Sequence, residues 1–170
     1  MMDKLELINQ IIEAHQVIRK NVSALGKTVA DREALFKLER EQYSWTPGQP
    51  GEMGARQQQI EETLQRLDQG LRSHFALEEQ YLPPLFGDLL MKGMLLEHHN
   101  LLEKLGQTRA MIAGKNPEFL SRAQLLEQQS SIRDAIGSLS RHIEDHASSE
   151  EVIFDMLKMT LEANPRDREL

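Results

Sequence analysis

The residues best suited to chemistry in this chain form two copies of a His-x3-Glu motif. The first copy is His74 with Glu78 and the second is His146 with Glu150, and each is followed directly by another glutamate. Residues four apart on an α-helix lie on the same face, one above the other. Each copy therefore aims an imidazole and a carboxylate at one point, and two copies on facing helices would surround a buried metal site.

Helices must position these motifs, because apolar residues recur at spacings of three and four and strand signals are scarce. Three stretches rich in Pro and Gly punctuate the chain: a loop at 45–54, a turn region from Pro83 to Gly93, and a break at 114–117. In the last stretch, Asn116 is the predicted N-cap of the next helix, with Pro117 as its first residue.

These breaks predict four long helices, near residues 3–42, 56–82, 88–113 and 117–162. Short connections favour antiparallel neighbours, so we expect an all-α, up-down-up-down antiparallel four-helix bundle. A chain of 170 residues is one domain by length. We assign the bundle to residues 1–163 and expect residues 164–170 to form a frayed C-terminal tail.

Two further histidines share the apolar faces of these helices. Each residue advances about 100° around a helix, which places His15 among isoleucines on the first helix and His98 at the centre of the apolar stripe on the third. Each half of the chain thus repeats one order, an inward His followed by His-x3-Glu, and this order suggests two hairpins related by a pseudo-twofold axis. The six candidate metal ligands are His15, His74, Glu78, His98, His146 and Glu150.

A simpler interpretation exists for each residue alone. One inward His is usually a hydrogen-bonded core residue, and one inward Glu can be an ion-pair partner. However, a buried carboxylate is costly without compensation. No Lys or Arg lies at the centre of the four apolar stripes, and Arg19 is nearest, to one side of His15. A pair of divalent metal ions balances these charges, so we favour the metal site.

The ligand set favours iron. Six N and O ligands exceed the four of a structural zinc site, and imidazole with carboxylate suits iron or manganese. If both glutamates bridge and each metal takes two histidines, a bridging oxo or hydroxo group leaves one position per metal for a small ligand. We therefore expect two non-haem iron ions with such a bridge, ahead of manganese or zinc.

The chain has no Glu-x2-His pair of the ferritin-like kind. Its proposed site is richer in His and poorer in negative charge, and fewer negative ligands stabilise a high-valent state less. This favours reversible binding or sensing over catalysis, and no catalytic residue is assigned.

Other polar residues have secondary assignments. His142 is expected to point inward and line the cavity behind the ligands, with direct coordination as the alternative. Tyr81 is expected to face inward and donate its hydroxyl to a carboxylate or a bound ligand, with a core aromatic as the alternative. Glu79 and Glu151 are expected to be solvated, with a supporting role as hydrogen-bond acceptors as the alternative.

Composition excludes several classes of partner and site. A net charge of −7 argues against a nucleic-acid partner. The absence of cysteine excludes disulfides, thiolate zinc sites, iron–sulfur clusters and a cysteine nucleophile. No secretory signal or membrane-spanning run is visible, so the cytoplasm is the simplest location and no membrane partner is expected. No protein partner is indicated.

The order of the motifs resembles the hemerythrin-like (HHE cation-binding) domain family, over nearly the whole chain. The matching segments are Glu13-Ala-His15, His74-x3-Glu78-Glu79, Glu97-His98 and His146-x3-Glu150-Glu151. This resemblance implies a four-helix bundle with a non-haem di-iron centre. It also implies roles in oxygen binding, in oxygen or iron sensing, or in responses to nitric oxide and peroxide.

The chain departs from the oxygen-carrying hemerythrins of invertebrates, because Leu102 replaces a second His on the third helix and His-x3-Glu replaces His-x4-Asp. We therefore expect a bacterial-type member that binds or senses oxygen, nitric oxide or iron. A first alternative is a stress-response enzyme or iron-donating repair protein acting on nitric oxide, peroxide or damaged iron–sulfur centres. A second alternative is a metal-free interaction module.

Overall fold

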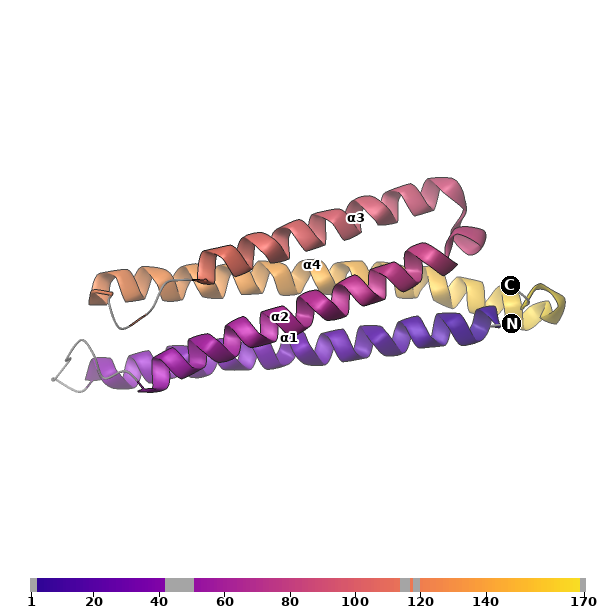
Figure 1. Cartoon of the computed structure of the whole chain (residues 1–170). Coiled ribbons are helices and arrows are strands. Elements are labelled where there is room, and N and C mark those ends of the chain that lie inside the picture. Colours follow the sequence, from indigo (N-terminus) through magenta and orange to yellow (C-terminus); the bar gives the residue numbers. More distant parts are fainter. Residues whose placement is uncertain (1–2, 42–50, 114–116, 118–119, 169–170) are drawn as a thin grey trace.

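The computed structural model describes residues 3–41, 51–113, 117 and 120–168. Its long helices and one short 3₁₀ helix are α1 (Lys4–Glu41), α2 (Gly51–Tyr81), α3 (Pro83–Ile112), α4 (Arg122–Ala163) and η2 (Pro165–Arg168). Helices α1 and α3 each pack against both α2 and α4. Consecutive helices run in opposite directions, and α1 begins at the end of the bundle where α4 finishes (Figure 1). The predicted all-α four-helix bundle is confirmed.

Helix α4 begins at Arg122, later than the predicted start at Pro117. Ser121 caps it: its hydroxyl accepts the backbone N–H of Gln124 at 3.4 Å, and the Gln124 side chain accepts the backbone N–H of Ser121 at 2.9 Å. This reciprocal capping box satisfies two N–H groups that the helix itself leaves free. The predicted cap, Asn116, lies outside the described residues.

The connections around α2 also differ from expectation. Helix α2 begins at Gly51, inside the predicted loop at 45–54, whose earlier part lies outside the described residues. Helix α3 begins at Pro83, where a missing N–H costs nothing. Gly87 then adopts φ 69° and ψ 169°, a conformation open essentially to glycine alone. The predicted turn region is thus reduced to one kink near the start of α3.

Two of the apolar clusters in the described part of the bundle lie on either side of a polar layer. Along α1, Ile11 belongs to one cluster and Ile18 to the other, with the buried His15 between them. The same alternation surrounds His98 on α3. The cluster nearer the start of α1 contains Leu7, Ile8, Ile11, Leu82, Met91, Met94, Phe154 and Leu161. The polar layer is therefore shielded from water along the bundle axis in both directions.

A second buried polar layer lies farther along α1. Arg32 is fully buried, and its guanidinium donates to the side-chain oxygens of Gln128 and Gln129 on α4. The expectation that no Lys or Arg occupies the centre of an apolar stripe is therefore wrong for α1. At about 1.5 Å rise per residue, Arg32 lies about 25 Å along the helix from His15.

The C-terminal segment is tied to the bundle. The Lys4 ammonium donates to the carbonyl of Asp167 at 2.8 Å, and the Arg168 Nε donates to the carbonyl of Leu161 at 3.0 Å. The expectation of a frayed tail is therefore wrong for residues 165–168, which form η2. The domain boundary at residue 163 stays a prediction. None of the helices within the described ranges is long and apolar enough to cross a membrane.

Candidate metal centre

All six predicted ligands converge in the polar layer between the two apolar clusters. Helices α1 and α3 each contribute one histidine, and α2 and α4 each contribute one His-x3-Glu pair. Every one of the six side chains is at most 6% exposed. The spacing of four within each pair puts its imidazole and carboxylate one turn apart on the inner face of the helix.

The ligand atoms fall into two overlapping groups. Within each group, the atoms that could hold a metal ion lie within 4.8 Å of one another. One group takes its histidines from the first half of the chain, and the other takes them from the second half. The groups are His15, His74, Glu78 and Glu150, and Glu78, His98, His146 and Glu150. Both carboxylates are thus shared, which is the arrangement needed to bridge two ions.

The Glu78 carboxylate turns its two oxygens toward different histidines. Its Oε1 lies 2.9 Å from the Nε2 of His74 and 3.7 Å from the Nε2 of His15. Its Oε2 lies 3.2 Å from the Nε2 of His98. One oxygen therefore faces each group, as a bridging carboxylate requires.

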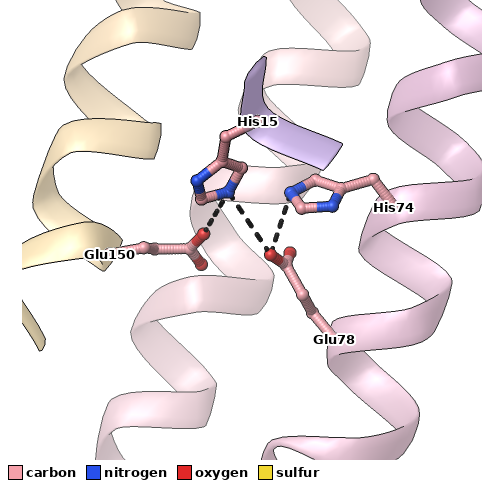
Figure 2. Close-up of side chains that lie close together, drawn as sticks. All are labelled: His15, His74, Glu78 and Glu150. Atoms are coloured by element: carbon pink, nitrogen blue, oxygen red, sulfur yellow. Dashed lines mark ion pairs between the residues drawn. The ribbon is translucent and has the colours of Figure 1, made fainter. Parts of the chain in front are cut away.

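The Glu150 carboxylate approaches from the opposite helix, α4. Its Oε2 lies 3.2 Å from the Nε2 of His15 and 3.6 Å from the Nε2 of His146. Figure 2 shows the imidazoles of His15 and His74 turned toward the Glu78 carboxylate, with Glu150 reaching His15 from the other side. The same six side chains thus surround one small volume from all four helices.

The inner atoms of this layer lack hydrogen-bond partners. Among the described residues, none satisfies the Nε2 of any of the four histidines or any oxygen of Glu78 and Glu150. These atoms meet one another only in the ion pairs described above, at 2.9–3.7 Å and without hydrogen-bond geometry, so burying them without cations is costly. Divalent cations between the nitrogens and oxygens would satisfy all of them together, so the donor set fits a metal pair.

Three of the histidines are held from behind by carboxylates. The Nδ1 of His15 lies 3.1 Å from Glu151, and the Nδ1 of His98 lies 2.9 Å from Glu79. The third such pair is His146 and Glu97: the Nδ1 of His146 lies 2.9 Å from the Glu97 carboxylate. A proton on Nδ1, donated to the carboxylate, leaves the lone pair on Nε2 for a metal and fixes the orientation of the ring.

These contacts bear out the supporting role of Glu79 and Glu151 that was given as the alternative from sequence. Glu79 is also exposed, as expected of a solvated residue, whereas Glu151 is half-buried. The support by Glu97 was not predicted. The only sequence signal for Glu97 was its position directly before His98. Its side chain is exposed and contacts His146 on another helix, so the periodicity of α3 does not indicate this role.

Arg19 connects the outer side of this layer to α4. Its guanidinium donates to Glu151 at 2.6 Å and to Glu144 at 2.8 Å. The contacts with Glu144 and Glu151 raise the pKa of Arg19, so the group carries its charge throughout the physiological range. Glu151 consequently divides its negative charge between His15 and a permanent cation.

Burial and charge act against each other in the metal-free layer. Burial lowers the pKa of His15, but the carboxylates of Glu150 and Glu78 outweigh it and raise that pKa to about 9. Burial alone would raise the pKa of Glu78, but the imidazoles of His15, His74 and His98 hold it well below its usual range. Burial raises the pKa of Glu150, and the negative charge of Glu78 raises it further. The contact with His15 lowers it but does not outweigh them. Burial also lowers the pKa of His98, but the carboxylates of Glu78 and Glu79 outweigh it and raise that pKa. Protons on His15 and His98 therefore balance the carboxylates where no cation is bound.

Two secondary assignments have different outcomes. His142 is exposed, and its Nδ1 lies 2.9 Å from the carbonyl of Ser138 on its own helix, so the prediction that it points inward behind the ligands is wrong. Tyr81 is half-buried and packs against the apolar cluster that contains Phe154. Donation from its hydroxyl to a carboxylate or a bound ligand stays a prediction.

The sequence over residues 6–157 matches the pattern of the hemerythrin HHE cation binding domain. This span contains all six candidate ligands and three of the four helices entire or nearly so, and it ends within α4. No curated protein and no solved structure matches the chain. The family match, together with the buried histidine and glutamate layer, shows that the chain belongs to the hemerythrin HHE cation-binding domain family.

Proposed function

We propose that this protein holds two non-haem iron ions in its polar layer and uses them to bind or sense a small ligand such as oxygen or nitric oxide. The observation that carries the proposal is the set of inner Nε2 and carboxylate atoms that are buried, unsatisfied and arranged in two groups sharing both glutamates. When bound, iron supplies a coordination position to which a small diatomic ligand attaches.

Each of the six side chains has a definite part in this proposal. Glu78 and Glu150 belong to both groups and would hold both ions, and each ion would also be held by the two histidines of one half of the chain. The carboxylates behind the histidines keep Nε2 free for the metal. The donor set of imidazole and carboxylate suits iron, and the matched family is described as a cation binding domain.

The apolar surroundings favour binding of an uncharged diatomic ligand. Phe75 stacks on His98 with ring centroids 3.8 Å apart, and Phe154 lies 6.4 Å from His15. These rings and the clusters beyond them keep water away from the ligands. A small apolar molecule loses little on entering such a site, whereas a charged substrate would lose its hydration.

The buried acid–base groups support binding over catalysis. In the described part of the chain, the buried titratable side chains are the six ligands and Arg32, and Arg32 belongs to the other layer. A reaction that consumes nitric oxide or peroxide needs protons delivered to the site. The predicted hydroxyl donor, Tyr81, is half-buried and packs in the adjoining apolar cluster.

The test is anaerobic reconstitution with ferrous iron, followed by absorption spectra on adding oxygen, nitric oxide or peroxide and then removing the ligand. Adducts that form and reverse without net consumption support binding or sensing. Catalytic consumption of nitric oxide or peroxide would replace the proposal with the stress-response enzyme. A folded protein that takes up no iron would replace it with the metal-free interaction module.

A further inference from the structure

The ligands of the two halves of the chain correspond position by position. His15 and Glu79 of the first half correspond to His98 and Glu151 of the second. The supporting contacts follow the same relation: His15 is held by Glu151 at 3.1 Å, and His98 is held by Glu79 at 2.9 Å. Each half thus supports the histidine that the other half contributes, and to this point the two metal positions are equivalent.

The correspondence fails one residue before each of these histidines. Glu97 precedes His98 and reaches the Nδ1 of His146 at 2.9 Å. The residue before His15 is Ala14, which has no carboxylate to offer His74. The Nδ1 of His74 is buried and finds no hydrogen-bond partner among the described residues. His74 is therefore the one ligand histidine there without support from behind.

A second difference concerns the remaining histidine of the first group. Glu151, which supports His15, is also bound by Arg19 at 2.6 Å and 3.2 Å. The position four residues after His98, corresponding to Arg19, is Leu102. A carboxylate that shares its charge with a guanidinium increases the basicity of an imidazole less than an unshared one. Both differences thus weaken the same pair, His15 and His74.

Supporting carboxylates matter because they orient the ring, fix the tautomer and make the nitrogen a better donor. Loss of one such partner typically lowers metal affinity about 10–100-fold. We propose that the two metal positions are unequal: the position of His98 and His146 fills first and holds its ion tightly, whereas the position of His15 and His74 is weaker and exchanges its ion. This inference rests on the proposed pair of metal ions and specifies how they differ.

The test is an anaerobic titration with ferrous iron against a competing chelator, with metal per chain measured after gel filtration. The wild-type protein is expected to show two binding phases separated by about 10–100-fold. His74→Ala should remove the weaker phase and leave the tight one, whereas His146→Ala should remove the tight one. If the wild-type protein bound two ions in a single phase, the two positions would have equal affinity. That result would overturn the inequality and leave the proposed pair of metal ions intact.

Exchanging the supporting residue tests the cause. Glu97→Ala should weaken the tight phase about 10–100-fold, and Ala14→Glu should strengthen the weaker phase. In the double variant Ala14→Glu/Glu97→Ala the order should reverse, so that His74→Ala now removes the tighter phase. An unchanged order in that double variant would overturn the assigned cause.

The exchange variants leave all six ligands in place, and helical content and melting of the metal-free forms control for folding. Absence of any iron binding by the folded wild-type protein would overturn this inference together with the proposed function. That outcome is distinct from the binding of two ions in a single phase, which would overturn the inference alone.

Discussion

The bundle contains two buried polar layers, and they solve the problem of buried charge in opposite ways. In the layer around Arg32, the guanidinium donates to Gln128 and Gln129, and only the Arg32 Nε and the Gln129 amide nitrogen are without a partner within the described residues. In the ligand layer, the same criterion leaves five histidine nitrogens and four carboxylate oxygens unpaired, the Nδ1 of His74 among them. One layer is closed by the chain's own amides, whereas the other is complete only with cations from solution.

This contrast predicts that the two layers respond to different measurements. Burial lowers the pKa of Arg32 to about 10, so the guanidinium stays charged at neutral pH and its partners matter to folding. The ligand layer instead lowers the stability of the metal-free protein, and metal binding is expected to stabilise the folded state. Changes around Arg32 should therefore alter stability, and changes among the ligands should alter metal content.

The largest expected effect is loss of both ions from the double variant Glu78→Ala/Glu150→Ala. These carboxylates belong to both ligand groups, so neither ion keeps its bridge. Metal analysis of the folded variant should find almost none. The exposed glutamates Glu103 and Glu162 provide the matched double control, which should keep the wild-type content. Two ions retained by Glu78→Ala/Glu150→Ala would refute the ligand assignment.

Arg32→Ala should lower the free energy of unfolding by about 3 kcal/mol, because it leaves a cavity and unpairs buried amides. Metal content should not change. Arg133→Ala is the control: Arg133 is exposed on α4, and removing it should cost less than about 0.5 kcal/mol. Urea denaturation measures both. Loss of metal from folded Arg32→Ala protein would show that the layers are not independent.

The metal-free protein should lose stability as pH rises. The pKa of His15 is raised from 6.5 to about 9 in the folded state, so its contribution is complete below pH 6.5 and is lost as pH passes through about 9. We expect a loss of about 1–3 kcal/mol between pH 6 and pH 9.5. Denaturation of the metal-free protein across this range measures it, with His15→Gln as the variant that should show a smaller slope. Equal stability at both ends would contradict the charge balance described for this layer.

The smallest expected effect marks the edge of the ligand layer. His142→Ala should leave the metal content and the ligand-binding spectrum unchanged, because His142 is exposed and bonded to its own helix. His146→Ala, one turn away, should lose an ion. Metal analysis of the two variants in parallel makes the comparison, and a lost ion in His142→Ala would restore His142 to the site.

The convergence of the six candidate ligands in one buried layer could be predicted from sequence because the motifs rest on local geometry. A spacing of four on a helix fixes the relative direction of His74 and Glu78 without knowledge of the neighbouring helices. The outer carboxylates could not be found in this way. The contact of Glu97 with His146 depends on how α3 lies against α4, and the full burial of Arg32 depends on two amides of α4.

The error over His142 has a geometric cause. At about 100° per residue, the buried positions of α4 such as Leu139, Ile143 and Glu150 centre about a quarter turn from His142. The spacing of four from His146 suggested a shared face, but His146 itself lies toward one edge of the apolar stripe. Counting the angle from the centre of the stripe would have placed His142 in solvent.

The most direct test of the account is the metal content and absorption spectrum of freshly purified wild-type protein. The arrangement of two ligand groups sharing Glu78 and Glu150 predicts about two iron ions per chain, with spectral bands that change on adding oxygen or nitric oxide. A folded protein that contains no metal, and takes up none from ferrous iron added without oxygen, would contradict it.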